Sequence, residues 1–390
     1  MADFATLKAR AEALNPALRA RAQSCEDLRR LPDETVADLH RSGLFRMLQP
    51  RRVGGSELPF RALVELGAIV AEGCGSTAWV LTNLASHHWM LGMWPKEAQD
   101  EVWDASPDDL ISSAFVFPAG HAVQVEGGYR LKGRWPFSSG VDPARWNLLG
   151  GVVRDERGRA LESRIFLVPA SDYRIVDGWF VTGLRGTGSK DVEMDETFVP
   201  SRRTLALAAI AGGSTPGSAV NPGTLYKLPA LGLFSFVVAA VSLGLARGAV
   251  ADYRASMTNR IGAYTGKRLA DIAGVQVRLA EASALTDIAS ALMLKDCDEA
   301  TLLTEAGTVP SLAEKARWRR DGAYAASMCT KAVELVFTAM GGAAVYLSQP
   351  IQRAFRDIAA ANAHHALNWD VNGTMWGRAT LDLPLEAQTL

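Results

Sequence analysis

The sequence predicts an α+β fold that is mostly helical and is built from three successive regions. Apolar residues recur with helical spacing through residues 1–108, and short alternating segments separated by Gly, Pro and Asp fill residues 109–210. Long helical patterns return over residues 211–390. We therefore expect an N-terminal helical domain, a central antiparallel β domain and a C-terminal four-helix bundle.

The N-terminal region has the spacing of amphipathic helices. In "DETVADLHRSGLF", which begins at Asp33, the apolar residues Val36 and Leu39 share one helix face. Further on, "GSTAWVLTNLASHHWMLGMW" is mostly apolar and long, with Ser76 or Thr77 as the expected N-cap. This second helix should therefore be buried.

The central region has the pattern of short strands. "HAVQVEGGYRLKGRWPFSSG" contains a Gly-Gly pair between two alternating segments, which predicts a hairpin. The runs "WNLLGGVV", "SRIFLVPA", "YRIVDGW" and "DVEMDETFVP" follow, each bounded by turn residues. Consecutive short strands of this kind predict antiparallel pairing.

The C-terminal region contains an uncharged stretch at residues 228–246, close to the length of a membrane span. Because it contains Pro229 and continues into an amphipathic segment, we predict a helix buried on all sides of a bundle and not a membrane helix. Residues 271–298 and 311–339 predict two more long helices. The Gly-, Ser- and Pro-rich stretch 211–224 predicts a flexible surface loop or a lid over a site.

Composition excludes several classes of partner. The chain has 390 residues, of which 48% are hydrophobic, and a formal net charge of −1, so neither nucleic acid nor a membrane surface is expected to bind it. The four cysteines are widely spaced without a CxxC, which favours neither a metal site nor a disulfide framework. The first residues carry charges throughout and lack the apolar core of a signal peptide. We expect a cytoplasmic protein.

Common catalytic and nucleotide-binding motifs are also missing from the sequence. No GxGxxG follows a strand and opens a helix, and no Walker loop, HExxH or GxSxG occurs. His364 and His365 are adjacent, and neighbours on a helix point about 100° apart, so they are not expected to bind one metal together. The sequence therefore predicts no metal site and no NAD(P)H-binding Rossmann unit.

Three motifs together resemble the acyl-CoA dehydrogenase flavoprotein superfamily over essentially the whole chain. "KGRWPFSSG" (132–140) resembles the strand motif that flanks the flavin in those proteins, and "GLRGTGSKDVEMDETFVP" (183–200) resembles a specific later segment. "AMGGAAVYLSQPIQRAFRDI" (339–358) resembles their paired-glycine loop followed by an Arg-Asp step. This resemblance implies the three-region fold described above and binding of a flavin.

Two departures point to one branch of that superfamily. Residues 356–370 contain no glutamate where a dehydrogenase keeps its base, and in 258–271 only Arg260 matches the flavin-pyrophosphate motif. The chain is more similar to the oxygenase components of two-component flavin monooxygenases. That resemblance implies hydroxylation of a small aromatic substrate, phenolic or indolic, with O₂ and reduced flavin (FMNH₂ or FADH₂). The flavin would come from a separate NAD(P)H-flavin reductase, and the oxygenase would be a homotetramer.

The resemblance also implies roles for individual residues. His364 would be the general base that accepts a proton from the aromatic ring, and a hydroxyl of Ser138 or Ser139 would lie near flavin N5. In this class reduced flavin and O₂ form a C4a-hydroperoxide, which an apolar pocket protects, and His87 would contact substrate or peroxide. The catalytic set is thus His364, Ser139 and His87. The other candidates are Trp135, Ser138, Arg260, Gly341 and Gly342 for flavin, and His88, Ser113, His365 and Trp369 for substrate.

Other interpretations stay open at this stage. The chain could be an acyl-CoA dehydrogenase with a relocated base, or a non-catalytic flavin-binding protein of the same fold. His87 and His88 could be satisfied core histidines, and the sequence does not say which of them faces a site. Gly341 and Gly342 could end a helix instead of admitting a flavin, and Arg260 could lie on a solvated face.

Overall fold

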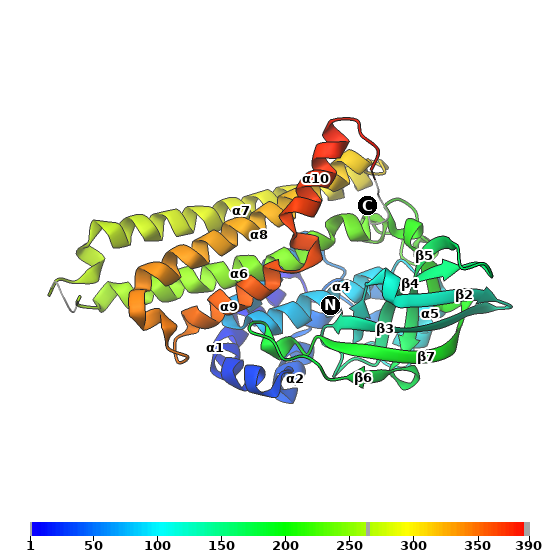
Figure 1. The fold of residues 1–390 in the computed structure, drawn as a ribbon, viewed down its shortest axis with the longest axis horizontal. Helices are drawn as coiled ribbons and strands as arrows, with labels where there is room; N and C mark the ends of the chain where they lie inside the picture. Colours follow the sequence, from blue (N-terminus) through cyan, green and yellow to red (C-terminus); the bar gives the residue numbers. More distant parts are fainter. Residues whose placement is uncertain (1, 263–265, 386–390) are drawn as a thin grey trace.

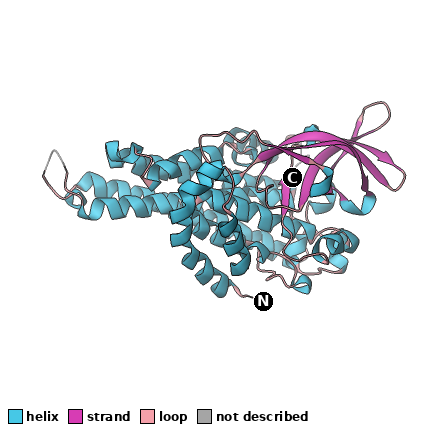
Figure 2. Ribbon diagram, turned by 90° about the horizontal axis from the view of Figure 1, so that it is seen from below, coloured by secondary structure: helices cyan, strands magenta, loops and turns pink. Residues whose placement is uncertain are grey.

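Helices and strands segregate along the chain as the sequence predicts. The computed structural model describes residues 2–262 and 266–385. In Figure 1 the strands gather at one end of the molecule and the long C-terminal helices extend toward the other, with the N-terminal helices packed below them. Figure 2 shows the same division from a second direction. The change from helix to strand and back therefore confirms the expected mostly helical α+β architecture.

Five helices form the N-terminal region: α1 Phe4–Leu28, α2 Asp33–Ser42, α3 Arg61–Gly73, α4 Gly75–Leu91 and α5 Lys96–Trp103. Every residue of α4 is buried, because α3, α6 and the first strand all pack against it. Its N-cap is Cys74, not the predicted Ser76 or Thr77. The Ser76 hydroxyl instead accepts a hydrogen bond from the Gly186 N–H at 3.2 Å, so it joins the helix to a loop of the β domain.

The central region is one sheet of eight strands: β1 Ile111–Ala114, β2 Gly120–Val125, β3 Gly128–Ser138, β4 Trp146–Arg154, β5 Ala160–Pro169, β6 Arg174–Val176, β7 Lys190–Pro200 and β8 Thr204–Ala206. Their order is β6-β7-β3-β2-β4-β5-β8, with β1 beside β4. The predicted hairpin joins β2 and β3, and Gly127 takes the left-handed conformation (φ 75°) at its turn.

The expectation of a wholly antiparallel sheet is wrong. β1 and β2 both pair with β4 in parallel, at residues 111–114 with 146–149 and at 121–123 with 152–154. The two short strands lie one after the other along the same edge of β4. The chain passes from β3 to β4 through residues 139–145, and the two strands do not form a hairpin. The other strand pairs are antiparallel, so the sheet is mixed.

Separate apolar cores lie against the two faces of the sheet. Ile111 and Leu148 belong to the large core that the sheet shares with the helices. Leu149 and Trp135 belong to a smaller core of residues from the β region. Because side chains alternate along a strand, neighbouring residues of one strand belong to different cores. This separation decides which strand residues can face the helices.

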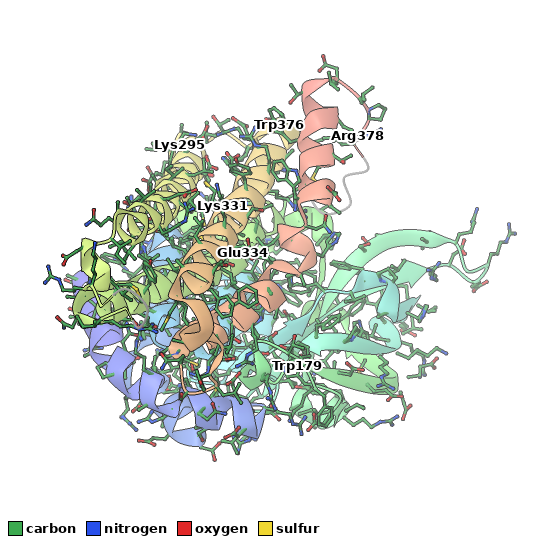
Figure 3. All side chains as sticks on the ribbon, turned by 60° about the vertical axis from the view of Figure 1, so that its left-hand side comes forward. Trp179, Lys295, Lys331, Glu334, Trp376 and Arg378 are labelled. Atoms are coloured by element: carbon green, nitrogen blue, oxygen red, sulfur yellow. The ribbon has the colours of Figure 1, made fainter. Side chains whose placement is uncertain are left out.

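The C-terminal region consists of α6 Ala230–Asn259, α7 Ala273–Glu305, α8 Leu312–Met340, α9 Pro350–Asn362 and α10 Trp369–Thr380. Helix α6 contacts α7, α8 and α9. Helix α10 packs on α8, and the Arg320 guanidinium carbon of α8 lies 4.3 Å from the ring centroid of Trp376 on α10, which is labelled in Figure 3. The region is therefore helical as predicted.

Helices α6 and α8 are long and apolar enough, by length and composition alone, to cross a membrane. In α6, however, 83% of the most apolar window is buried inside the protein, which confirms the predicted core helix. In α8 the corresponding share is 39%. One side of α8 is therefore exposed in the single chain.

The stretch 211–224 is neither a free loop nor a lid in this structure. It includes the short helix Pro216–Ala219, and the Gly217 N–H donates to the Met93 carbonyl at 2.9 Å. Asn221 is buried, and its side-chain amide donates to the Gly92 carbonyl at 2.8 Å. These bonds fix the segment to the end of α4, which corrects the prediction of a flexible loop.

Candidate active site

A bulge near the end of β3, just before the two predicted serines, sets which of them faces helix α4. The pairing of β3 with β7 shifts register between Trp135 and Ser138, and Phe137 takes φ 68° there. Trp135 and Ser138 both lie on the side of the smaller core, where the Ser138 hydroxyl accepts from the Asn147 side chain at 2.9 Å. Ser139 instead faces helix α4. Bulges commonly re-aim a side chain in this way.

The Ser139 hydroxyl belongs to a chain of four hydrogen bonds. The Trp79 indole N–H donates to Ser139 Oγ at 3.0 Å, and Ser139 Oγ lies 2.7 Å from Ser189 Oγ. Ser189 Oγ lies 2.7 Å from Thr187 Oγ1, which donates to the Leu184 carbonyl at 3.0 Å. Strand β3, helix α4 and the loop before β7 are therefore joined at one hydroxyl.

The loop 183–189 that carries this chain is held by helix α9. The Leu184 N–H donates to Asp357 Oδ1 at 2.7 Å, and Leu184 has a left-handed backbone (φ 51°). A Cβ at Gly183 would lie 2.0 Å from the Arg356 carbonyl oxygen, so only glycine allows this approach. Burial raises the pKa of Asp357 to about 7. The Arg-Asp step of the sequence thus fixes a loop of the β domain.

Three aromatic side chains, Trp79, Phe234 and Phe115, connect this hydroxyl chain to both candidate histidines. The Trp79 and His364 ring centroids are 5.6 Å apart, and those of Phe234 and His364 are 6.0 Å apart. Phe115 lies 6.2 Å from Phe234 and 6.1 Å from His87, edge-on in both cases. Helices α4 and α6, the end of β1 and the turn after α9 therefore contribute to one aromatic site.

His364 caps the short turn His365–Leu367, and this role fixes its tautomer. Its Nδ1 accepts a hydrogen bond from the Ala366 N–H at 3.1 Å, so in the neutral ring the proton lies on Nε2. Burial, followed by the nearby His365 and Arg319, lowers the pKa of His364 to about 4. A neutral ring in this orientation offers an N–H donor at Nε2, which does not fit its predicted role as a base there.

His87 has the opposite tautomer. Its Nδ1 lies 2.7 Å from the Ile111 carbonyl oxygen, an acceptor, so the proton lies on Nδ1. The Nε2 lone pair is buried without a hydrogen-bond partner, and burial lowers the pKa of His87 to about 4. Ser113 lies two residues along β1 from Ile111 and is half-buried. His87, and not His364, therefore presents the free acceptor nitrogen.

Three predicted substrate contacts lie elsewhere. His88 Nδ1 accepts from the Trp103 indole N–H at 3.2 Å, and burial lowers the pKa of His88 to about 3. His88 is thus a core histidine facing α5: its Nδ1 is bonded, and its Nε2 is buried without a partner and, because Nδ1 accepts, carries the ring proton. His365 is exposed, and Trp369 packs on Tyr324 at 5.4 Å on the outer side of α8. Of the adjacent histidine pairs, His87 and His364 are the members that join the aromatic site.

The predicted flavin contacts do not gather within one chain. Trp135 is fully buried and its indole N–H donates to the Gly150 carbonyl at 2.6 Å, which gives it a structural role. Arg260 follows α6 at the end of the bundle away from the sheet, and Gly341 and Gly342 follow α8 (Figure 1). A Cβ on either glycine would meet no atom within 4 Å.

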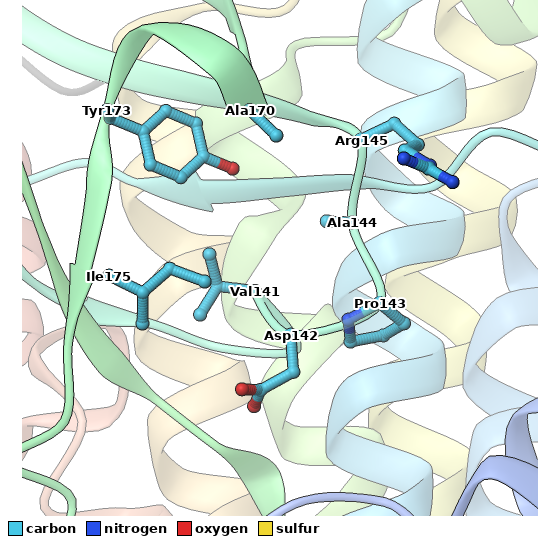
Figure 4. Close-up of a pocket in the computed structure, with 8 residues that line it drawn as sticks. All are labelled: Val141, Asp142, Pro143, Ala144, Arg145, Ala170, Tyr173 and Ile175. Carbon is cyan, nitrogen blue, oxygen red and sulfur yellow. The ribbon is translucent and has the colours of Figure 1, made fainter.

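A cavity lies beside the site and contains none of the predicted residues. Its volume is about 580 Å³, and Figure 4 shows the Tyr173 hydroxyl directed into it. It is lined by Val141, Asp142, Pro143, Ala144, Arg145, Ala170, Tyr173 and Ile175. Asp142 accepts a hydrogen bond from the Lys190 ammonium at 2.6 Å, and Lys190 directly follows Ser189 in the chain. The cavity therefore adjoins the loop that carries the hydroxyl chain.

The residues around Ser139 fit a flavin and not a metal. Phe137 is 62% exposed although it is a large aromatic side chain, and Ser139 beside it is partly exposed. A planar aromatic ring system with N–H groups would cover the first and hydrogen-bond the second. Over residues 2–262 and 266–385, no group of three or more His, Cys, Asp or Glu side chains could hold a metal ion.

The chain is similar in sequence and in fold to known flavin-dependent enzymes. Residues 236–369 match the acyl-CoA dehydrogenase C-terminal domain family. The chain is 37% identical to the FADH(2)-dependent resorcinol hydroxylase oxygenase component of Rhizobium sp. (strain MTP-10005), covering 95% of this chain and 92% of that one. Among solved structures it is similar to the 3-HSA hydroxylase from Rhodococcus sp. RHA1, with a TM-score of 0.94, 35% identity and 99% of each chain covered.

A further structure with its cofactor bound is XiaF from Streptomyces sp. in complex with FADH2 and glycerol. The TM-score is 0.91 and the identity 27%, over 99% of this chain and 98% of that one. The chain belongs to the flavin-dependent monooxygenases, as an oxygenase component of the two-component aromatic hydroxylases. This result removes the dehydrogenase and non-catalytic alternatives.

Proposed function

We propose that this chain hydroxylates a small phenolic compound, with His87 as the proton acceptor and His364 as a hydrogen-bond donor. The observation that carries the proposal is the buried His87 Nε2, a lone pair without a partner beside the edge of Phe115. An unpaired buried acceptor is costly. A substrate O–H would satisfy it and would gain electron density as its proton moves toward His87.

The remaining polar groups support an anionic substrate oxygen. The neutral His364 offers Nε2–H to an oxygen, and its proton is held there by the Ala366 amide. Arg319 is buried near His364, and its guanidinium donates to the Asn372 side-chain oxygen at 3.1 Å. A buried cation lowers the free energy of a nearby phenolate. The pair of opposite tautomers and this charge favour a phenol over an indole.

The overall reaction balances with reduced flavin and O₂. Ar–H, O₂ and reduced flavin give Ar–OH, H₂O and oxidised flavin, so one oxygen atom enters the ring and the flavin supplies two electrons. When bound, reduced flavin activates O₂ to an electrophilic oxygen donor. The rings of Phe115, Phe234 and Trp79 exclude water around the substrate, which protects that oxygen from loss as hydrogen peroxide.

Reduced flavin would come from a separate NAD(P)H-flavin reductase in the cytoplasm. The absence of a Rossmann GxGxxG from the sequence supports this source. A direct test mixes the protein with FMNH₂ or FADH₂, O₂ and a panel of phenols and indoles, including resorcinol. We expect a hydroxylated phenol at near one equivalent per reduced flavin. If every reduced flavin yields only hydrogen peroxide with every phenol, the proposal is wrong.

His87 and His364 are distinguished by matched variants. His87→Phe should lose hydroxylation with phenol substrates of high pKa and retain more with substrates already ionised at the assay pH. His364→Gln keeps an N–H donor and should retain more coupling than His364→Leu, which has none. Equal losses at all substrate pKa values for His87→Phe would contradict its role as the proton acceptor.

We also propose that the chain is a homotetramer in which α6 to α9 form the predicted four-helix bundle. Support comes from large apolar side chains that are exposed on α7, α8 and the segment after α8. They are Val277, Ile288, Leu302, Leu312, Val345, Tyr346 and Leu347. Exposed apolar area of this extent is typical of an interface. Light scattering should give four chains for wild type and fewer for Leu302→Glu; a monomeric wild type would contradict the proposal.

A further inference from the structure

The hydroxyl chain of Ser139, Ser189 and Thr187 has only one direction that makes all four of its bonds. Each hydroxyl carries one proton. Thr187 donates to the Leu184 carbonyl, which can only accept. The Thr187–Ser189 bond must then use the Ser189 proton, and the Ser139–Ser189 bond must use the Ser139 proton.

This direction leaves Ser139 without a proton to offer. Its hydroxyl hydrogen is directed to Ser189, and one of its lone pairs accepts from the Trp79 indole N–H at 3.0 Å. A serine oxygen has two lone pairs, so a single lone pair remains. Since Ser139 is partly exposed while Thr187 is buried, this lone pair is what the chain presents to a ligand.

We infer that Thr187 and Ser189 are positioning residues that hold Ser139 as a hydrogen-bond acceptor and so make the site prefer reduced to oxidised flavin. Reduced flavin carries an N–H at N5, where oxidised flavin has only a lone pair. A fixed acceptor can hydrogen-bond the N5–H of reduced flavin. With oxidised flavin the same acceptor faces the N5 lone pair and has no hydrogen-bond partner. The inference rests on the proposed function, and it assigns a redox preference to two residues that do not themselves face the ligand.

Thr187→Val tests the inference without altering Ser139. The variant removes the acceptor of the Ser189 proton, and that proton can then turn toward Ser139, whose own proton becomes available to the ligand. The measurement is the dissociation constant of FMN and FAD, in oxidised form and, anaerobically, in reduced form. We expect the ratio of oxidised to reduced dissociation constants to fall about three- to tenfold, the effect of one hydrogen bond.

Two variants control for a merely structural effect. Thr187→Ser restores the hydroxyl and should restore the wild-type ratio. Thr286→Val removes a buried hydroxyl that likewise donates to a carbonyl three residues earlier, Ser283 at 2.8 Å, but lies on α7, and it should leave the ratio unchanged. If Thr187→Val does not fold, as judged by thermal unfolding, Ser189→Ala frees the same Ser139 proton and carries the same expectation.

The outcomes separate the inference from the function on which it rests. If the wild type binds neither form of flavin, the proposed function fails. If the wild type binds flavin without preferring the reduced form, the inference fails while the function stands. The same holds if folded Thr187→Val prefers reduced flavin as strongly as the wild type does.

Discussion

Replacing Asp357 by asparagine should change how stability depends on pH. The carboxyl is 1% exposed, and Oδ1 accepts the Leu184 N–H that fixes the loop 183–189. Asparagine keeps an acceptor oxygen in the same place but has no proton to lose. The comparison therefore isolates the cost of ionising a buried group that joins helix α9 to the β domain.

The sign follows from the pKa of Asp357, which burial raises from 3.8 to about 7. Between these two values the folded protein holds a proton that the unfolded chain has lost. Stability from this group is therefore complete below pH 3.8 and is lost as the pH rises through about 7. Since one pKa unit corresponds to about 1.4 kcal/mol, wild type should lose about 2–3 kcal/mol relative to Asp357→Asn between pH 5 and pH 7.

Urea unfolding of the flavin-free protein at several pH values measures this difference. Exposed Asp195, replaced by asparagine, is the matched control and should give a constant difference from wild type over the same range. A constant difference between wild type and Asp357→Asn from pH 5 to pH 8 would refute the reasoning, because it would mean that the buried carboxyl does not take up a proton on folding.

Three other predictions follow from the site. The pKa values of His87 and His364 are both lowered to about 4, so each ring is neutral above pH 5. An inflection of kcat/KM between pH 6 and 10 should therefore move with the pKa of the substrate phenol. An inflection at the same pH for all substrates would contradict this. Phe137→Gly should raise the free energy of unfolding by about 1 kcal/mol, because φ 68° strains any residue but glycine, and it should weaken flavin binding. Calorimetry measures the stability and flavin titration the binding. A Tm below that of wild type would argue against strain. Gly183→Ala should cost about 2 kcal/mol or more, since its Cβ would lie 2.0 Å from a backbone oxygen; wild-type stability would show that the loop can move.

Local patterns predicted the fold because they depend on neighbouring residues. The uncharged stretch that begins α6 required burial on every side, and the structure provides it. The direction of strand pairing was not predictable in the same way. Side chains alternate along a strand whether its partner is parallel or antiparallel, so the pairing of β1 and β2 with β4 has no local signature.

The site was predictable by residue type but not by orientation. The sequence indicates His87, His364 and the serine pair, yet the bulge at Phe137 decides that Ser139 and not Ser138 faces α4. The tautomer of each histidine depends on a backbone group, the Ile111 carbonyl or the Ala366 amide, whose position only the fold sets. Thr187 and Ser189 lay in a recognised motif, but nothing in it indicated their mutual hydrogen bond.

Adjacent serines at the end of β3, Ser138 in the strand and Ser139 just after it, belong to networks on opposite sides of one sheet. Ser138 bonds with Asn147 on one side, and Ser139 bonds with Trp79 on the other. A shift of β4 that moved Asn147 would therefore pull on Ser138, the residue next to Ser139, whose hydroxyl we propose faces the flavin. Substitutions in the interior of the β domain, remote from any substrate, are thus a route by which evolution or design could tune how tightly oxygen activation is coupled to hydroxylation.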